Sequence, residues 1–140
     1  MFTGFDPSNT NAVARSGSLR PDRIADGNLP QGERSITRWF DAAAFVAPPR
    51  NAGRFGTSAP FILRGPGMAV WSAGLSKQFG LGEGRRLRLM GTFQNLANHP
   101  NYALPANNIA APASVGRITS LIGTEGSGPR TVEISARFEF

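Results

Sequence analysis

The sequence predicts an all-β protein in which antiparallel hairpin strands are joined by long loops. Three segments alternate polar and apolar residues, as strands with one apolar face do. The 140 residues include 17 Gly and 11 Pro, which favours turns over helices. No apolar run approaches the 18 or so residues of a membrane-spanning helix. A membrane protein built from this chain would therefore be a β-barrel, and the alternating strands would form part of its wall.

Residues 1–66 are predicted to form a loop-rich region, because turn-forming pairs such as Asp6-Pro7 and Pro48-Pro49 punctuate them. A short aromatic anchor is expected at 38–45. There Asp41 can cap a helical turn through the alanines that follow it. Burial of the three aromatic residues of this anchor would fix the loop: Trp39, Phe40 and Phe45.

Residues 67–140 are predicted to supply the last strands of a barrel. Met68–Phe79 and Arg86–Gln94 alternate, and the glycine-rich segment Gly80–Gly84 between them predicts a hairpin. Lys77 interrupts the apolar face of the first strand. At a strand end near the membrane boundary, a lysine can extend back to water.

The connection from residue 97 to residue 129 is predicted to be a long loop, with Val115–Ile122 as a candidate short strand. The last strand, Arg130–Phe140, has the roughly 9–11 residues that a transmembrane β-strand needs. Its alternation from Thr131 onward has a chance probability on the order of 0.002. One short turn and one long loop are typical of outer-membrane barrels, and would place the glycine turn and Phe140 on the periplasmic side.

No enzymatic chemistry is predicted. The chain has no Cys and a single His, so thiolate and histidine metal sites have few ligands available. Gly80–Gly84 lacks the spacing of a dinucleotide fingerprint, and a strand follows it where a helix is required. His99 precedes Pro100 and is expected to make local hydrogen bonds in a loop. We therefore expect no catalytic residue, no cofactor and no metal ion.

The net charge of +6 and the pI near 11.4 would suit an anionic partner. However, the basic residues are spread along the chain, and only Arg85, Arg86 and Arg88 cluster. No nucleic-acid partner is expected, because nucleic-acid footprints concentrate charge on one face. The first residues lack the basic stretch and apolar core of a signal peptide, so an export signal is expected elsewhere.

Several motifs occur in an order that resembles a known family. They are the terminal strand, Trp39-Phe40-Asp41-Ala42-Ala43-Ala44-Phe45, Gly65-Pro66-Gly67, Leu75-Ser76-Lys77-Gln78-Phe79 and Phe93-Gln94-Asn95-Leu96-Ala97-Asn98-His99-Pro100-Asn101-Tyr102. From about Arg20 onward, the chain resembles the C-terminal end of a TonB-dependent outer-membrane receptor of the Oar-like type abundant in acidobacteria. Gln94 and Ala97 depart from the family pattern, which has aromatic residues there.

This resemblance implies an outer-membrane barrel of about 22 strands with an N-terminal plug, energised by TonB and importing solutes. The chain would supply about three or four of those strands and no plug. It is thus expected to be a fragment without transport activity of its own. Its expected partners are outer-membrane lipid, the remaining barrel and plug, and the barrel assembly machinery. The assembly signal would comprise Phe140, Phe138, Ala136, Ile134 and Val132.

The alternative interpretation is a small soluble β-module that binds partners through its loops. The two interpretations differ in where the apolar strand faces lie. In a barrel they form an exterior band in contact with lipid, whereas a soluble module buries them against a second layer.

Overall fold

The computed structural model describes residues 1, 3–9, 19–124 and 126–140. Residue 2 and residues 10–18 of the predicted loop-rich region, and residue 125 of the predicted long loop, lie outside the described residues. The chain divides into two compact units. The N-terminal unit comprises Met1–Gly65 and Leu104–Thr119, and the sheet unit comprises Pro66–Ala103 and Ser120–Phe140.

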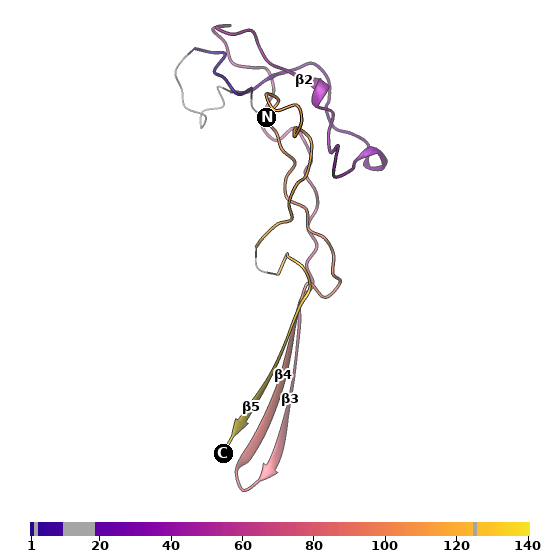
Figure 1. Cartoon of the computed structure of the whole chain (residues 1–140), viewed down its shortest axis with the longest axis vertical. Helices are drawn as coiled ribbons and strands as arrows, with labels where there is room; N and C mark the ends of the chain where they lie inside the picture. The colour runs from indigo at the N-terminus through magenta and orange to yellow at the C-terminus, as the bar shows by residue number, and fades with distance from the viewer. Residues whose placement is uncertain (2, 10–18, 125) are drawn as a thin grey trace. The chain divides into compact units, whose positions relative to one another are not determined.

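The sheet unit contains three long antiparallel strands in the order β3-β4-β5 (Figure 1). Strand β3 spans Ala73–Gly82, β4 spans Arg85–Gln94 and β5 spans Thr131–Glu139. Each strand pairs with its neighbour in sequence, so β4 lies in the middle. The predicted all-β antiparallel fold is confirmed, and the two later strands begin and end within one residue of their predicted bounds.

The first strand differs from its prediction at both ends. Its predicted start at Met68 is wrong, because the backbone before Ala73 bonds elsewhere: the N–H of Ala69 donates to Asn101 Oδ1 over 2.8 Å. At the other end the strand continues through Gly82, with an irregularity in the ladder between Gly80 and Gly82. The turn therefore narrows to Glu83 and Gly84, whose φ angles are +50° and +80°. Glycine adopts a positive φ without steric cost, so Gly84 favours a turn at this position.

The candidate strand Val115–Ile122 is not present as a strand in the structure. Its backbone instead bonds to separate loops, so no continuous ladder forms. The carbonyl of Arg117 accepts from Ala106 N–H over 2.8 Å, and Ile118 N–H donates to Ile36 O over 2.8 Å. Near its end, Leu121 forms an isolated antiparallel bridge with Tyr102.

Where the structure describes it, the N-terminal unit is mostly irregular, with two short strands and two single-turn helices. Strand β1 (Asp22–Arg23) pairs antiparallel with β2 (Phe45–Val46), and the 3-10 helices are η2 (Gln31–Glu33) and η3 (Ala42–Ala44). Asp41 Oδ1 accepts from Ala43 N–H over 3.3 Å, which confirms the predicted cap. Among the described residues, no helix is long and apolar enough to cross a membrane.

The buried core of this unit is the predicted aromatic anchor. Phe40 and Phe45 are 3% and 4% exposed, and their rings meet edge to face with centroids 6.3 Å apart. Trp39 lies at the margin of this cluster, and its indole N–H donates to Arg64 O over 2.8 Å. Gly27 has a φ of +78°, and an added Cβ would approach the Phe45 ring within 2.5 Å. A glycine is therefore needed where the chain passes over this ring.

Candidate membrane-facing surface of the sheet

The strand register places apolar side chains from all three strands on one face of the sheet. Successive side chains of a strand point to opposite faces, so directly paired residues share a face. From the hairpin end, the rows of this face are Phe79–Leu87–Phe138, Lys77–Leu89–Ala136, Leu75–Gly91–Ile134 and Ala73–Phe93–Val132. Lys77 is the one charged residue in these rows. We call this the apolar face.

The opposite face is polar. Its rows, again from the hairpin end, are Gly80–Arg86–Glu139, Gln78–Arg88–Arg137, Ser76–Met90–Ser135 and Gly74–Thr92–Glu133. Met90 is the one large apolar residue among them. A sheet with one apolar and one polar face, maintained over three strands, is the pattern of a barrel wall between lipid and an aqueous interior.

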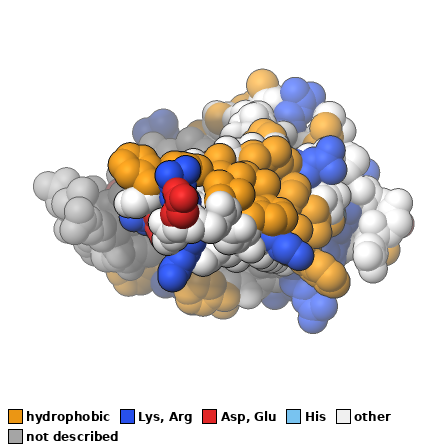
Figure 2. Space-filling view, turned by 90° about the horizontal axis from the view of Figure 1, so that it is seen from below, with side chains coloured by type: hydrophobic (Ala, Val, Ile, Leu, Met, Phe, Trp, Pro, Cys, Tyr) orange, Lys and Arg blue, Asp and Glu red, His pale blue; other side chains and the backbone are white. Residues whose placement is uncertain are grey.

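The apolar face is open in the structure. Ile134, near its middle, is 80% exposed, and Leu75, in the same row but on β3, is also exposed. Figure 2, a view from below, shows exposed hydrophobic side chains together with Lys and Arg side chains. Contiguous apolar surface of this kind is unfavourable in water and indicates a surface that lipid or protein covers.

Aromatic residues lie at both ends of the apolar face. Phe79 and Phe138 occupy the row nearest the hairpin, and Phe93 occupies the row at the far end. The Phe138 ring also contacts Phe140, with centroids 5.7 Å apart. Ten strand residues in β3 extend about 33 Å, and a strand tilted by about 40° then spans the roughly 25 Å of the apolar band in outer-membrane barrels. The aromatic rows, six residues or about 20 Å apart along β4, contain the residue type that forms the interfacial girdles of such barrels.

Lys77 lies in the second row from the hairpin, close to one of these ends. Its Nζ lies 5.9 Å from the centroid of the Phe79 ring, in the neighbouring row toward the hairpin. The aliphatic stem of the lysine thus covers apolar surface while its ammonium group lies near the aromatic end, where headgroups and water begin.

A family model described as an outer membrane beta barrel domain matches residues 2–133. The chain belongs to this family. Neither a search of curated proteins nor a search of solved structures gave a match. An outer membrane beta barrel domain is located in the outer membrane, and the two-faced sheet supplies part of its wall. Membership of the family favours the predicted barrel segment over the soluble β-module.

Four of the residues predicted to form the assembly signal lie together on the apolar face of this beta barrel segment, all in β5: Val132, Ile134, Ala136 and Phe138. Phe140 follows the end of β5 and is almost fully exposed. The structure thus places four of the five residues on one face of β5 and the fifth, Phe140, directly after its end.

Sequence reasoning missed a buried polar cluster beside the sheet. Asn95 and Asn101 are 1% and 0% exposed. The Asn95 side chain donates to His99 O and Gly128 O over 2.9 and 2.7 Å and accepts from His99 N–H over 3.0 Å. The sequence offered one signal of this cluster, three asparagines within the seven residues 95–101. Asn is ordinarily a surface residue, so this signal did not indicate burial. The backbone N–H and carbonyl of His99 form the local hydrogen bonds that were predicted for this residue.

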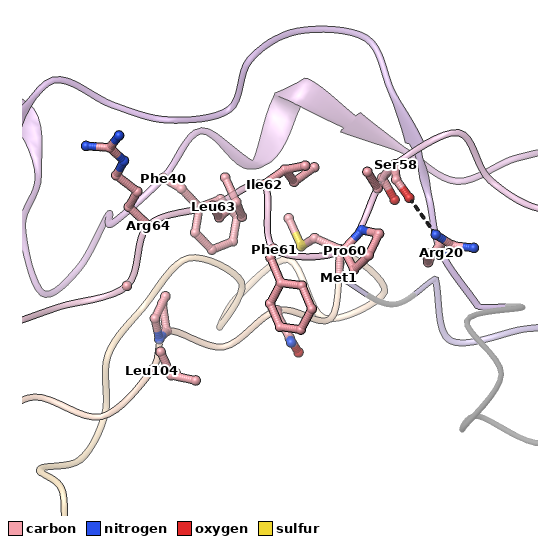
Figure 3. A pocket seen from close by; sticks show the side chains of 14 residues that line it. Met1, Arg20, Phe40, Ser58, Pro60, Phe61, Ile62, Leu63, Arg64 and Leu104 are labelled. Carbon is pink, nitrogen blue, oxygen red and sulfur yellow. Dashed lines mark hydrogen bonds between the residues drawn. The ribbon is translucent and has the colours of Figure 1, made fainter.

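The N-terminal unit contains a cavity of about 450 Å³. Figure 3 shows its apolar lining, in which the segment 59–63 faces Phe40 and Leu104. Phe61 has a φ of +58° and is fully exposed, an unfavourable conformation for a bulky residue. Among the described residues, no three His, Asp or Glu side chains are grouped so that they could hold a metal ion.

Proposed function

We propose that this chain is the C-terminal barrel segment of a TonB-dependent outer-membrane receptor, with the polar face lining the lumen. The observation that carries the proposal is the separation of apolar and polar side chains in register across β3, β4 and β5. The motif order described above supports the TonB-dependent type. The main role of the segment is structural, and most of the receptor's solute specificity would come from its plug and loops.

The sheet requires further strands to act in this way. The smallest outer-membrane barrels have about eight strands. The described residues provide three long strands, and one edge of β3 and one edge of β5 have no neighbour there. Open strand edges promote pairing with other chains. We infer that these edges pair with the remaining receptor strands, that a plug occupies part of the lumen, and that the segment transports nothing alone.

The last strand also has a proposed role in assembly. The apolar side chains of β5, together with Phe140, would be recognised by the barrel assembly machinery before the barrel closes. An exposed edge offers backbone groups for strand addition, and the alternating side chains offer the specificity.

A chimaeric receptor tests the proposed function. Residues 66–140 would replace the last three strands and their loops in a TonB-dependent receptor with a measurable solute uptake. We expect the chimaera to reach the outer membrane and to migrate as a heat-modifiable barrel on gels. We also expect solute uptake that is lost when TonB is deleted. A matched chimaera in which Ile134 and Ala136 are both changed to Lys should not assemble.

Two results would contradict the proposal. Degradation of both chimaeras, when the unmodified receptor assembles, would show that the segment is not a receptor barrel wall. Assembly without any TonB-dependent uptake would support the barrel domain but not the receptor type.

A further inference from the structure

Three arginines gather on the polar face in the two rows nearest the hairpin: Arg86, Arg88 and Arg137. Arg88 is paired directly with Arg137 across β4 and β5. Directly opposed side chains in antiparallel strands lie about 5 Å apart at Cβ, and like charges in this position destabilise the sheet. A sheet would not gain stability from this pair unless something negative lay between the two guanidinium groups.

The neighbouring side chains neutralise the group only in part. Arg88 Nη2 donates to Gln78 Oε1 over 3.1 Å, and this partner is uncharged. Glu139 is the one carboxylate in these two rows, and its Oε1 lies 3.3 Å from Arg137 Nε. The other acid of the polar face, Glu133, lies in the fourth row. One carboxylate therefore faces three guanidinium groups.

The side chains are also available to a ligand. The Arg137 side chain is 74% exposed. Within the part of the chain that the structure describes, the Arg86 guanidinium forms no ion pair or hydrogen bond. Planar guanidinium groups bind carboxylate and phosphate oxygens through two parallel hydrogen bonds, which a lysine cannot do.

We propose that Arg86, Arg88 and Arg137 form an oxyanion-binding site on the polar face, near the hairpin end of the sheet. Its ligand is the carboxylate or phosphate group of a small solute. The inference rests on the proposed function in one respect, because the polar face must line a water-filled lumen for a solute to reach it. An oxyanion between Arg88 and Arg137 would replace their mutual repulsion with two attractive contacts.

Inorganic phosphate is a suitable probe. The full chain would be placed in detergent micelles, and the thermal midpoint of its β-sheet signal would be followed by circular dichroism. Phosphate would be added at constant ionic strength, with chloride as the comparison anion. We expect phosphate, but not chloride, to raise the midpoint of the unmodified chain.

Variants distinguish a specific phosphate-binding site from a general screening of charge repulsion by added ions. Arg88→Gln and Arg137→Gln should each weaken the apparent phosphate affinity about ten- to hundredfold, since each removes hydrogen bonds to a charged ligand. Without phosphate, Arg88→Gln should leave the midpoint unchanged or higher because the like-charge pair is gone. Glu139→Gln should strengthen phosphate binding, because it removes the competing carboxylate. Arg64→Gln, in the N-terminal unit, is the matched control and should respond as the unmodified chain does.

An equal phosphate response in the unmodified chain and in Arg88→Gln would overturn the proposal. A response to tetraglutamate in the absence of any response to phosphate would also overturn it, in favour of an acidic protein segment. Neither result would affect the membrane-facing role of the apolar face, which is tested separately by lipid exposure.

Discussion

The side-chain amides of Asn95 and Asn101 donate to the same acceptor, the carbonyl of His99, over 2.9 and 3.3 Å. Asn101 also donates to Ser127 O over 3.1 Å and accepts from Ala69 N–H over 2.8 Å. These bonds connect segments that precede β3, follow β4 and precede β5. The irregular ends of three strands are thus held together by two buried side chains.

Asn101→Ala should therefore destabilise the sheet unit. The substitution removes the partner of the Ala69 N–H, in a partly buried bond, and the partner of the Ser127 carbonyl, in a buried bond. An unsatisfied buried polar group costs about 1–3 kcal/mol of unfolding free energy. Chemical denaturation of the full chain in micelles measures the loss. Asn107→Ala, at an exposed position of the N-terminal unit, is the matched control, and an equal effect of both variants would show that the cluster does not stabilise the sheet.

The N-terminal unit should lose stability in acid through Asp22. Arg54 bonds both carboxylate oxygens over 2.7 Å, and these bonds lower the pKa of Asp22 from 3.8 to about 2. The folded pKa lies below the unfolded pKa. The stabilisation is therefore complete above about pH 4 and is lost as the pH falls from there through about 2.

Asp22→Asn should remove this pH dependence while lowering stability at neutral pH. Fluorescence of Trp39 would report unfolding of the N-terminal unit, with Trp71 changed to Phe so that one indole remains. An unfolding free energy that falls equally between pH 4 and pH 2 in both proteins would assign the acid sensitivity to other groups.

The faces of β5 should differ in their tolerance of charge. Ile134 and Ser135 are neighbours in the chain and lie on opposite faces in the third row from the hairpin. Ile134→Lys should cost about 2–4 kcal/mol in a lipid bilayer, because the new charge lies near the bilayer midplane. Ser135→Lys should have little effect because it faces water. Urea unfolding of the full chain in lipid vesicles measures the unfolding free energy of each variant. Similar losses of unfolding free energy in the two variants would argue against a lipid-facing surface.

The proposed assembly signal can be tested on a peptide of residues 130–140. The peptide should bind the barrel assembly machinery, and removal of Phe140 should weaken the binding, since an aromatic anchor is lost. Glu133→Gln should matter less, because Glu133 lies on the polar face. A scrambled peptide of identical composition is the control. If it bound as well as the native peptide, the segment would be an ordinary amphipathic strand.

Sequence reasoning recovered the features that depend on local pattern. Alternation defines β4 and β5, because side-chain direction in a strand follows from position alone. It overestimated β3 at its start, since the apolar run Met68–Trp71 leads directly into the alternating segment. There the N–H of Ala69 bonds to Asn101, and no local signal reveals a partner 32 residues away. The β1–β2 pair was also missed, because strands of two residues are too short to show any periodicity.

Two neighbouring residues of the middle strand, β4, allow a test of whether the apolar face contacts lipid. Leu89 and Met90 are adjacent, both apolar and almost equally exposed, at 40% and 41%, but they lie on opposite faces. The chain has no Cys, so Leu89→Cys and Met90→Cys each give one site for a nitroxide spin label.

Electron paramagnetic resonance of each labelled full chain in lipid vesicles measures collisions with oxygen, which concentrates in lipid, and with a water-soluble nickel complex. We expect the label at residue 89 to collide mainly with oxygen and the label at residue 90 to collide mainly with the nickel complex. Equal accessibility of both labels to the nickel complex would contradict a membrane-facing apolar face. So would a label at residue 89 that neither reagent reaches, because that result would indicate burial against a second protein layer.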